Sequence, residues 1–250
     1  MYQGITTKDS ILLKNRETGA ELYDVTVESF EEHLQWLHDN DYFTERPKLD
    51  SSSISVKKKV TLTFDDGEMN NFTHALNVLQ KFEYSAYFFI IGEKIGKPGY
   101  MGWKELGKLH EAGMTLGSHG LSHEILTNLL DTQIEEELLA SKKYLERNLN
   151  ITVNSLSIPH GFCNEKIIRM AYETGYSKIF VSNKPINIQS SYLERIAVKN
   201  TWDLKRFQQA LEGKIPFKEK VSAMIKSPAK IILRERGYNA VRSLLIKIIN

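Results

Sequence analysis

The chain has 250 residues, of which 41% are hydrophobic and 26% are charged, and it carries a formal net charge of +2. These values suit one soluble globular domain with a sizeable core. The single cysteine, Cys163, excludes an internal disulfide, and no apolar run reaches the length of a membrane span. Residues 1–5 lack the basic and apolar regions of a signal peptide, so we expect a cytoplasmic protein.

The first part of the chain predicts two strands, one helix and a surface loop. Residues 1–5 favour a short strand, and the helical spacing of apolar side chains over residues 27–40 predicts a helix with Thr26 as its N-cap. Residues 47–59 contain three consecutive serines and three consecutive lysines, which is typical of a loop. The apolar, β-branched run over residues 60–64 then predicts a buried strand.

Helical and extended patterns alternate through the rest of the body. Further strands are predicted over 85–91, 114–118, 156–161, 178–182 and 195–198, and further helices over 70–82, 103–112, 132–149, 165–174 and 203–211. Asn164 is expected to cap one of these helices, and Glu135, Glu136 and Glu137 are interpreted as a solvated helix face. Strands that alternate with helices indicate a parallel sheet, and chemically active residues at their carboxyl ends indicate a barrel mouth.

The end of the chain differs from the body in charge. Residues 214–250 hold nine Lys or Arg and two Asp or Glu, a net +7, whereas the rest holds 24 basic and 29 acidic residues, a net −5. We therefore divide the chain into a body of residues 1–213 and a basic helical extension of residues 214–250. The extension either packs across the floor of the body or makes peripheral contact with a membrane or a partner, and the sequence leaves both open.

Two adjacent carboxylates, Asp65 and Asp66, follow the buried strand over residues 60–64. A desolvated anion must be paired, protonated or bound to a cation, so we expect positive charge at this position. A metal ion is the candidate. By itself, an Asp-Asp-Gly sequence is typical of a solvated turn.

A histidine pair about fifty residues later supports the metal hypothesis. His119 and His123 are spaced i and i+4, which would place both on one side of a helical turn. Two histidines and one carboxylate give three protein ligands and leave coordination positions open, which is typical of a catalytic site. A lone histidine pair is more often surface or core, but its occurrence with the two aspartates favours a metal site.

The TFDDG sequence at residues 63–67, followed by His-x-x-x-His, resembles the first two motifs of the polysaccharide deacetylases, the NodB-homology carbohydrate esterases. The chain looks like a divergent member of the exopolysaccharide type, and the resemblance covers residues 1–202. It implies an α/β fold, a distorted (β/α) barrel with about seven parallel strands. It also implies metal-assisted hydrolysis of an acetyl amide.

The resemblance assigns roles to individual residues. It implies that Asp65 is the catalytic base and that the metal ligands are Asp66, His119 and His123. Zinc is the default ion for two histidines and a carboxylate, although cobalt, nickel or manganese could occupy the same ligands.

The later motifs of that family are altered in this chain. Ser157 stands where the third motif has an arginine, and we hypothesise that Arg195 fills the same space and orients Asp65. His160 follows the motif's proline, where its backbone N–H could bind an oxyanion and its ring could protonate the leaving amine or contact sugar. No fourth motif occurs around residues 182–188 and no fifth motif near the C-terminus, which leaves the general acid unassigned. Gln3 replaces a histidine found in related sequences.

Three functions are compatible with these residues. The first is a metal-dependent deacetylase acting on N-acetylated sugars of a polysaccharide or its precursor. The second is a catalytically silent glycan-binding or assembly protein on the same barrel. The third is a metal amidohydrolase acting on another amide, with Phe162, Tyr176 and Trp202 available for stacking. No recognised motif indicates binding of nucleic acid.

Overall fold

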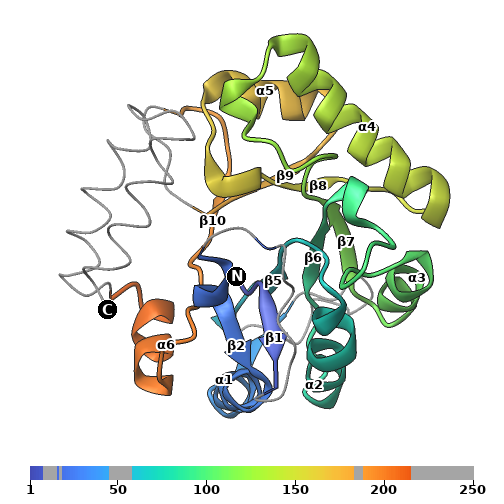
Figure 1. Ribbon diagram of the computed structural model, residues 1–250. Coiled ribbons are helices and arrows are strands. Elements are labelled where there is room, and N and C mark those ends of the chain that lie inside the picture. The colour runs from blue at the N-terminus through green and yellow to red at the C-terminus, as the bar shows by residue number, and fades with distance from the viewer. Residues whose placement is uncertain (8–15, 17–18, 45–57, 183–187, 215–250) are drawn as a thin grey trace, which may run out of the picture.

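The computed structural model of the chain describes residues 1–7, 16, 19–44, 58–182 and 188–214. Its centre is a curled sheet of parallel strands with helices around its outer side (Figure 1). The sheet order follows the chain order, so each strand pairs with the one before it. The strands are β5 (Thr63–Phe64), β6 (Tyr87–Ile90), β7 (Thr115–Ser118), β8 (Ser155–Ser157), β9 (Lys178–Val181) and β10 (Leu193–Glu194).

Two small sheets accompany the main one. Strands β1 (Gly4–Thr6) and β2 (Asp24–Thr26) form one pair, and β3 (Tyr42–Phe43) and β4 (Lys58–Lys59) form the other. Among the described residues the main sheet therefore has six strands, and our prediction of about seven was wrong. The N-terminal strand pairs with β2 instead, and it is joined to the main sheet by an isolated bridge between Tyr2 and Phe64.

The helices lie close to the predicted ranges. They are α1 (Val27–Asp39), α2 (Leu76–Lys81), α3 (Trp103–Glu111), α4 (Asp131–Leu149), α5 (Glu165–Glu173) and α6 (Leu204–Leu211), and a π-helix (Asn71–Ala75) precedes α2. Both predicted N-caps are confirmed. The Thr26 hydroxyl accepts a hydrogen bond from the Ser29 amide at 3.2 Å, and the side-chain oxygen Oδ1 of Asn164 accepts one from the Ile167 amide at 3.0 Å.

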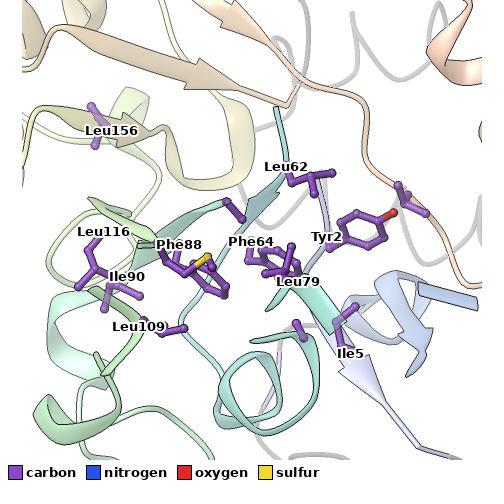
Figure 2. Close-up of a cluster of buried hydrophobic side chains, with 14 of the residues drawn as sticks. Tyr2, Ile5, Leu62, Phe64, Leu79, Phe88, Ile90, Leu109, Leu116 and Leu156 are labelled. Atoms are coloured by element: carbon purple, nitrogen blue, oxygen red, sulfur yellow. The ribbon is translucent and has the colours of Figure 1, made fainter. Parts of the chain in front are cut away.

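The hydrophobic core lies between the sheet and the helices. Figure 2 shows strand side chains such as Phe64, Phe88 and Leu116 packed near Leu79 of α2 and Leu109 of α3. Because side chains alternate along a strand, the residues between these core positions point to the inner face of the curl. Burial of the outer face explains why these strands appear in the sequence as apolar runs.

The inner face of the curl is filled with side chains. The guanidinium of Arg195 lies over the rings of Phe89 and Phe180, at 5.4 and 5.9 Å from their centres. Gly117 leaves room for this packing, because a Cβ there would lie 2.6 Å from the Phe89 ring and 2.6 Å from the Ser155 hydroxyl. Because side chains fill the interior of the curl, the chemically active groups lie at its end, where the strands have their carboxyl ends.

Two local predictions differ from the structure. The strand predicted over 195–198 was wrong, because backbone pairing with β9 ends at Arg195. The Val198 amide instead donates to the Met1 carbonyl at 3.0 Å. The last two residues of the loop predicted over 47–59 form strand β4. The basic extension over 214–250 lies outside the described residues except for Lys214. Within the part of the chain that the structure describes, no helix is long and apolar enough to span a bilayer.

Candidate metal centre

The two aspartates lie in a tight turn that directly follows β5. Asp66 and Gly67 both adopt left-handed backbone conformations, with φ of +72° and +78°. Glycine is favoured at the second position, and a Cβ there would also lie 3.2 Å from the Ile90 side chain. The turn directs the two carboxylates differently: Asp65 pairs with Arg195 on the inner face of the sheet, and Asp66 lies beside both histidines. Both aspartates are buried.

The two histidines belong to the segment that follows β7, here called the histidine loop (residues 119–123). The predicted helical turn was wrong, because this segment is a loop in which Gly120 and His123 have φ of +79° and +69°. The ring nitrogens still converge, and the Nε2 atoms of His119 and His123 are 3.3 Å apart. His119 donates from Nδ1 to the Ser157 carbonyl at 2.8 Å. That bond leaves Nε2 of a neutral His119 ring as the free ligand atom.

Asp66 completes a group of three possible ligands. Its Oδ1 lies 3.5 Å from Nε2 of His119 and 3.7 Å from Nε2 of His123. Ligand atoms about 2.0–2.1 Å from one ion at tetrahedral angles are roughly 3.4 Å apart, so the three atoms fit a divalent metal. Burial lowers the pKa of His119 despite the nearby carboxylates, which keeps its ring in the neutral form that binds metal.

Asp65 is held by Arg195, as the sequence hypothesis proposed. The guanidinium Nη1 and Nη2 lie 2.7 and 2.9 Å from Oδ1 and Oδ2 of the carboxylate. Nη2 also donates to the Ser157 hydroxyl at 2.7 Å, and that hydroxyl donates to Asp65 at 3.3 Å. Burial alone would raise the pKa of Asp65, but the adjacent Arg195 guanidinium brings it below its usual value. The Asp65 carboxylate is therefore ionised and fixed in orientation.

His160 lies beside the candidate metal centre, and its ring contacts the backbone of His123. It follows β8 in a short 3-10 helix (Pro159–Gly161) and has a φ of +57°. Its Nε2–H donates to the His123 carbonyl at 3.0 Å, and the two rings are centred 4.4 Å apart. His160 thus supports the backbone of a candidate ligand.

Sequence reasoning missed two groups that support the site. The Gln3 amide nitrogen donates to Oδ2 of Asp66, and the signal for this contact was the position of Gln3, where related sequences have a histidine. Glu137, predicted to be solvated, is buried and accepts hydrogen bonds from Leu121 and Ser122 of the histidine loop. Its burial was detectable in principle, because the helical spacing from Ile134 places position 137 on the apolar face of α4.

A small cavity of about 50 Å³ adjoins the candidate ligands. Asp66 and His123 form part of its wall, together with Gln3, Lys94 and Tyr100. The predicted stacking roles of two aromatic residues were wrong, because Tyr176 and Trp202 are buried, 2% and 8% exposed respectively. The Tyr176 hydroxyl donates to the Leu138 carbonyl at 2.9 Å, which places it in the core.

Comparison with known proteins places these features in a wider context. Residues 53–179 match the family model described as polysaccharide deacetylase. The Bacillus subtilis protein YxkH is 32% identical over 70% of this chain and 61% of its own length. The poly-beta-1,6-N-acetyl-D-glucosamine N-deacetylase of Staphylococcus epidermidis is 26% identical over 61% of this chain and 59% of its own length. The chain thus spans about three fifths of these relatives, 61% and 59%.

A solved structure shares the fold. The Streptococcus pyogenes deacetylase PplD, determined in complex with acetate, superposes with a TM-score of 0.70 at 23% sequence identity. The match covers 86% of this chain and 96% of PplD. The curled sheet and its outer helices are therefore an arrangement that this chain shares with PplD.

Proposed function

The chain belongs to the polysaccharide deacetylase family, and from this we propose that it is a metal-dependent hydrolase that removes acetyl groups from N-acetylated sugars of a polysaccharide or its precursor. The substrate class is supported by the relative from Staphylococcus epidermidis, whose name specifies a polymer of N-acetyl-D-glucosamine. Because this chain spans only part of such relatives, the sugar and its polymer belong to the proposal.

One observation carries the proposal: three possible ligand atoms converge beside a buried, ionised carboxylate. Oδ1 of Asp66 and the Nε2 atoms of His119 and His123 lie within 4.8 Å of one another. Asp65 reaches to 3.8 Å from Nε2 of His119. We assign the first three residues to a divalent metal, with zinc as the default ion for two nitrogens and one carboxylate oxygen. A bound ion of this kind supplies a more acidic water and a positive charge for the acyl oxygen.

We assign Asp65 the role of general base. Its carboxylate stays ionised because Arg195 stabilises the anion, so it can take a proton from the attacking water. Arg195 and Ser157 restrict its orientation through the contacts described above. A fixed orientation keeps the accepting oxygen directed at the water. Addition of that water to the acyl carbon and cleavage of the amide then yield acetate and the free amine.

We assign His160 a positioning role. Its Nε2 already donates to the His123 carbonyl, which favours support of the metal ligand over protonation of the leaving amine. A hydrogen bond to the backbone of a ligand restricts the directions in which that ligand can point.

The proposal is tested by metal content and acetate release. Protein purified without chelator is expected to hold nearly one metal ion per chain, and His123→Ala is expected to lose it. Asp65→Asn should retain the metal but release little acetate from N-acetylglucosamine oligomers, because an amide is a poor base. If the wild-type chain binds no zinc, cobalt or nickel, the hydrolase proposal fails and a silent glycan-binding protein becomes the better description.

A further inference from the structure

The histidine loop is held on both of its backbone sides. On one side, the amides of Gly92 and Glu93 donate to the carbonyls of Gly120 and Leu121, at 3.1 and 2.8 Å. On the other side, the amides of Leu121 and Ser122 donate to a side chain of α4. His123, a non-glycine residue, has a left-handed backbone, and such a conformation persists only where surrounding contacts determine it. A partner for these amides therefore decides where the loop, and His123 at its end, is placed.

Glu137 of α4 is that partner. Its carboxylate accepts from the Leu121 amide at 2.8 Å and from the Ser122 amide at 3.1 Å. It also accepts from the Ser122 hydroxyl at 2.5 Å. A buried carboxylate is costly unless hydrogen bonds replace its water, and the loop supplies these bonds. Gly120 lets the carboxylate approach, because a Cβ there would lie 3.3 Å from Oε2 of Glu137.

The neighbouring glutamates do not share this environment. Glu135 and Glu136 are exposed, whereas Glu137 is 8% exposed. The buried face of α4 to which Glu137 belongs also contains Ile134, Leu138, Ser141 and Leu145. Glu137 is thus the one charged residue on the buried face of α4, and it faces the loop that carries two candidate ligands.

We propose that Glu137 is a positioning residue that sets the location of His123 at the candidate metal centre. This inference rests on the proposed function, since it gives Glu137 a role in the geometry of the same site. Two consecutive amides bound to one carboxylate fix the backbone of the loop just before His123. The His123 ring can then lie with its Nε2 at 3.3 Å from that of His119.

Zinc affinity of the full chain tests the proposal. Glu137→Gln keeps the size of the side chain but replaces one accepting oxygen with a donor that faces the loop amides. We expect its zinc affinity, measured by competition with a chromophoric chelator, to fall about 10- to 100-fold. Glu136→Gln makes the same chemical change on the exposed face and should bind zinc as the wild type does. Wild-type affinity in a folded Glu137→Gln protein would overturn the proposal.

Ser122→Ala provides a variant that leaves the glutamate in place. It removes only the hydroxyl contact, so it is expected to weaken zinc binding less than Glu137→Gln does. If the two residues act together, the effects of the two changes should be less than additive in the double variant. Unchanged zinc affinity in Ser122→Ala, with Glu137→Gln unfolded, would count against the proposal.

A measurement without metal separates this inference from the proposed function. In Glu137→Gln, hydrogen exchange at Leu121 and Ser122 should accelerate, and the NMR signals of the His123 ring should shift. If the wild type binds no metal but these signals shift, the hydrolase proposal fails while the positioning role stands. If the ring signals are unchanged, the positioning role is wrong whatever the metal content.

Discussion

Arg195 and Asp65 form a bidentate ion pair although they are 130 positions apart in the sequence. Asp65 follows β5 and Arg195 follows β10, and these strands are the two opposite edges of the main sheet. Their contact is possible because the sheet curls until its edges approach. The pair therefore holds the edges together at the end of the sheet where the candidate metal centre lies.

Replacing Arg195 should affect both stability and acetate release. Arg195→Ala leaves the Asp65 carboxylate buried without its partner, and loss of one member of a buried pair costs roughly 3–5 kcal/mol. Arg195→Lys keeps the charge but cannot bond both oxygens, so we expect an intermediate loss in each measurement. Urea unfolding and acetate release measure the two effects. Lys205→Ala, at an exposed position of α6, is the control; equal stability of Arg195→Ala and the wild type would contradict the expected role.

The pH dependence of acetate release should also respond to Arg195. Arg195 is a main cause of the lowered pKa of Asp65, so Arg195→Ala should raise that pKa. The base is then protonated over a wider range, and the acidic limb of the pH profile of kcat/KM should move to higher pH. A limb that stays at its wild-type position would mean that Asp65 is not the group that titrates.

His160→Ala should weaken metal binding. The variant removes the donor to the His123 carbonyl, and loss of a hydrogen bond that orients a metal ligand typically costs 10- to 100-fold in metal affinity, so we expect a decrease of about tenfold. His160→Asn can supply an N–H from a shorter side chain and should restore part of the affinity. Full zinc affinity in His160→Ala would show that the ring does not support His123.

Two glycine substitutions should change stability in opposite directions. Gly117→Ala places a methyl group 2.6 Å from the Phe89 ring, and overpacking of this kind costs typically about 1–3 kcal/mol. Gly107 lies in α3 with no atom within 4 Å of an added Cβ. Gly107→Ala should therefore stabilise the protein by about 0.5–1 kcal/mol, because alanine favours the helix. Urea unfolding measures the stability of both variants. Destabilisation by Gly107→Ala would contradict the expected gain in helix stability.

Acid should destabilise the protein through a histidine remote from the histidine loop. His33 is buried, stacks on Phe207 at 4.1 Å between ring centres, and its pKa is lowered by burial to about 4. Between pH 6.5 and 4 the unfolded chain binds this proton and the folded chain does not, so stability falls as the pH falls. The loss from this group is about 3 kcal/mol.

Urea unfolding at several pH values measures that loss. His33→Asn cannot titrate, so its stability should depend less on pH over the same range. His110→Gln, at an exposed position of α3, is the matched control and should keep the wild-type dependence. An unchanged dependence in His33→Asn would show that another group is responsible.

The features that sequence reasoning predicted correctly are those that neighbouring residues determine. The N-caps Thr26 and Asn164, and the apolar runs of the buried strands, depend on local hydrogen bonding and on one-sided burial. The pairing of Arg195 with Asp65 was reached differently. It followed from the serine that replaces an arginine in a family motif and from the need of Asp65 for a fixed orientation.

The features that were missed depend on tertiary contacts. A spacing of four residues suggested a helical turn for His119 and His123, but the left-handed backbone of their loop is set by Glu137, Gly92 and Glu93. Tyr176 was expected to be available for stacking, yet its hydroxyl finds a partner in the core, which a sequence does not reveal. The strand count failed because β1 pairs with β2, a choice that depends on where the chain turns back.

The ion pair across the sheet edges has a consequence for synthesis. The strands lie in the sheet in the order in which the ribosome makes them, so the partners of β5 to β9 are all available while the carboxylate of Asp65 still lacks its counter-charge. Only when β10 has emerged and docked does Arg195 neutralise that group. The docking of β10 therefore completes the sheet and also gives Asp65 its counter-charge. A translation product that stops before Arg195 would lack the ion pair that orients Asp65.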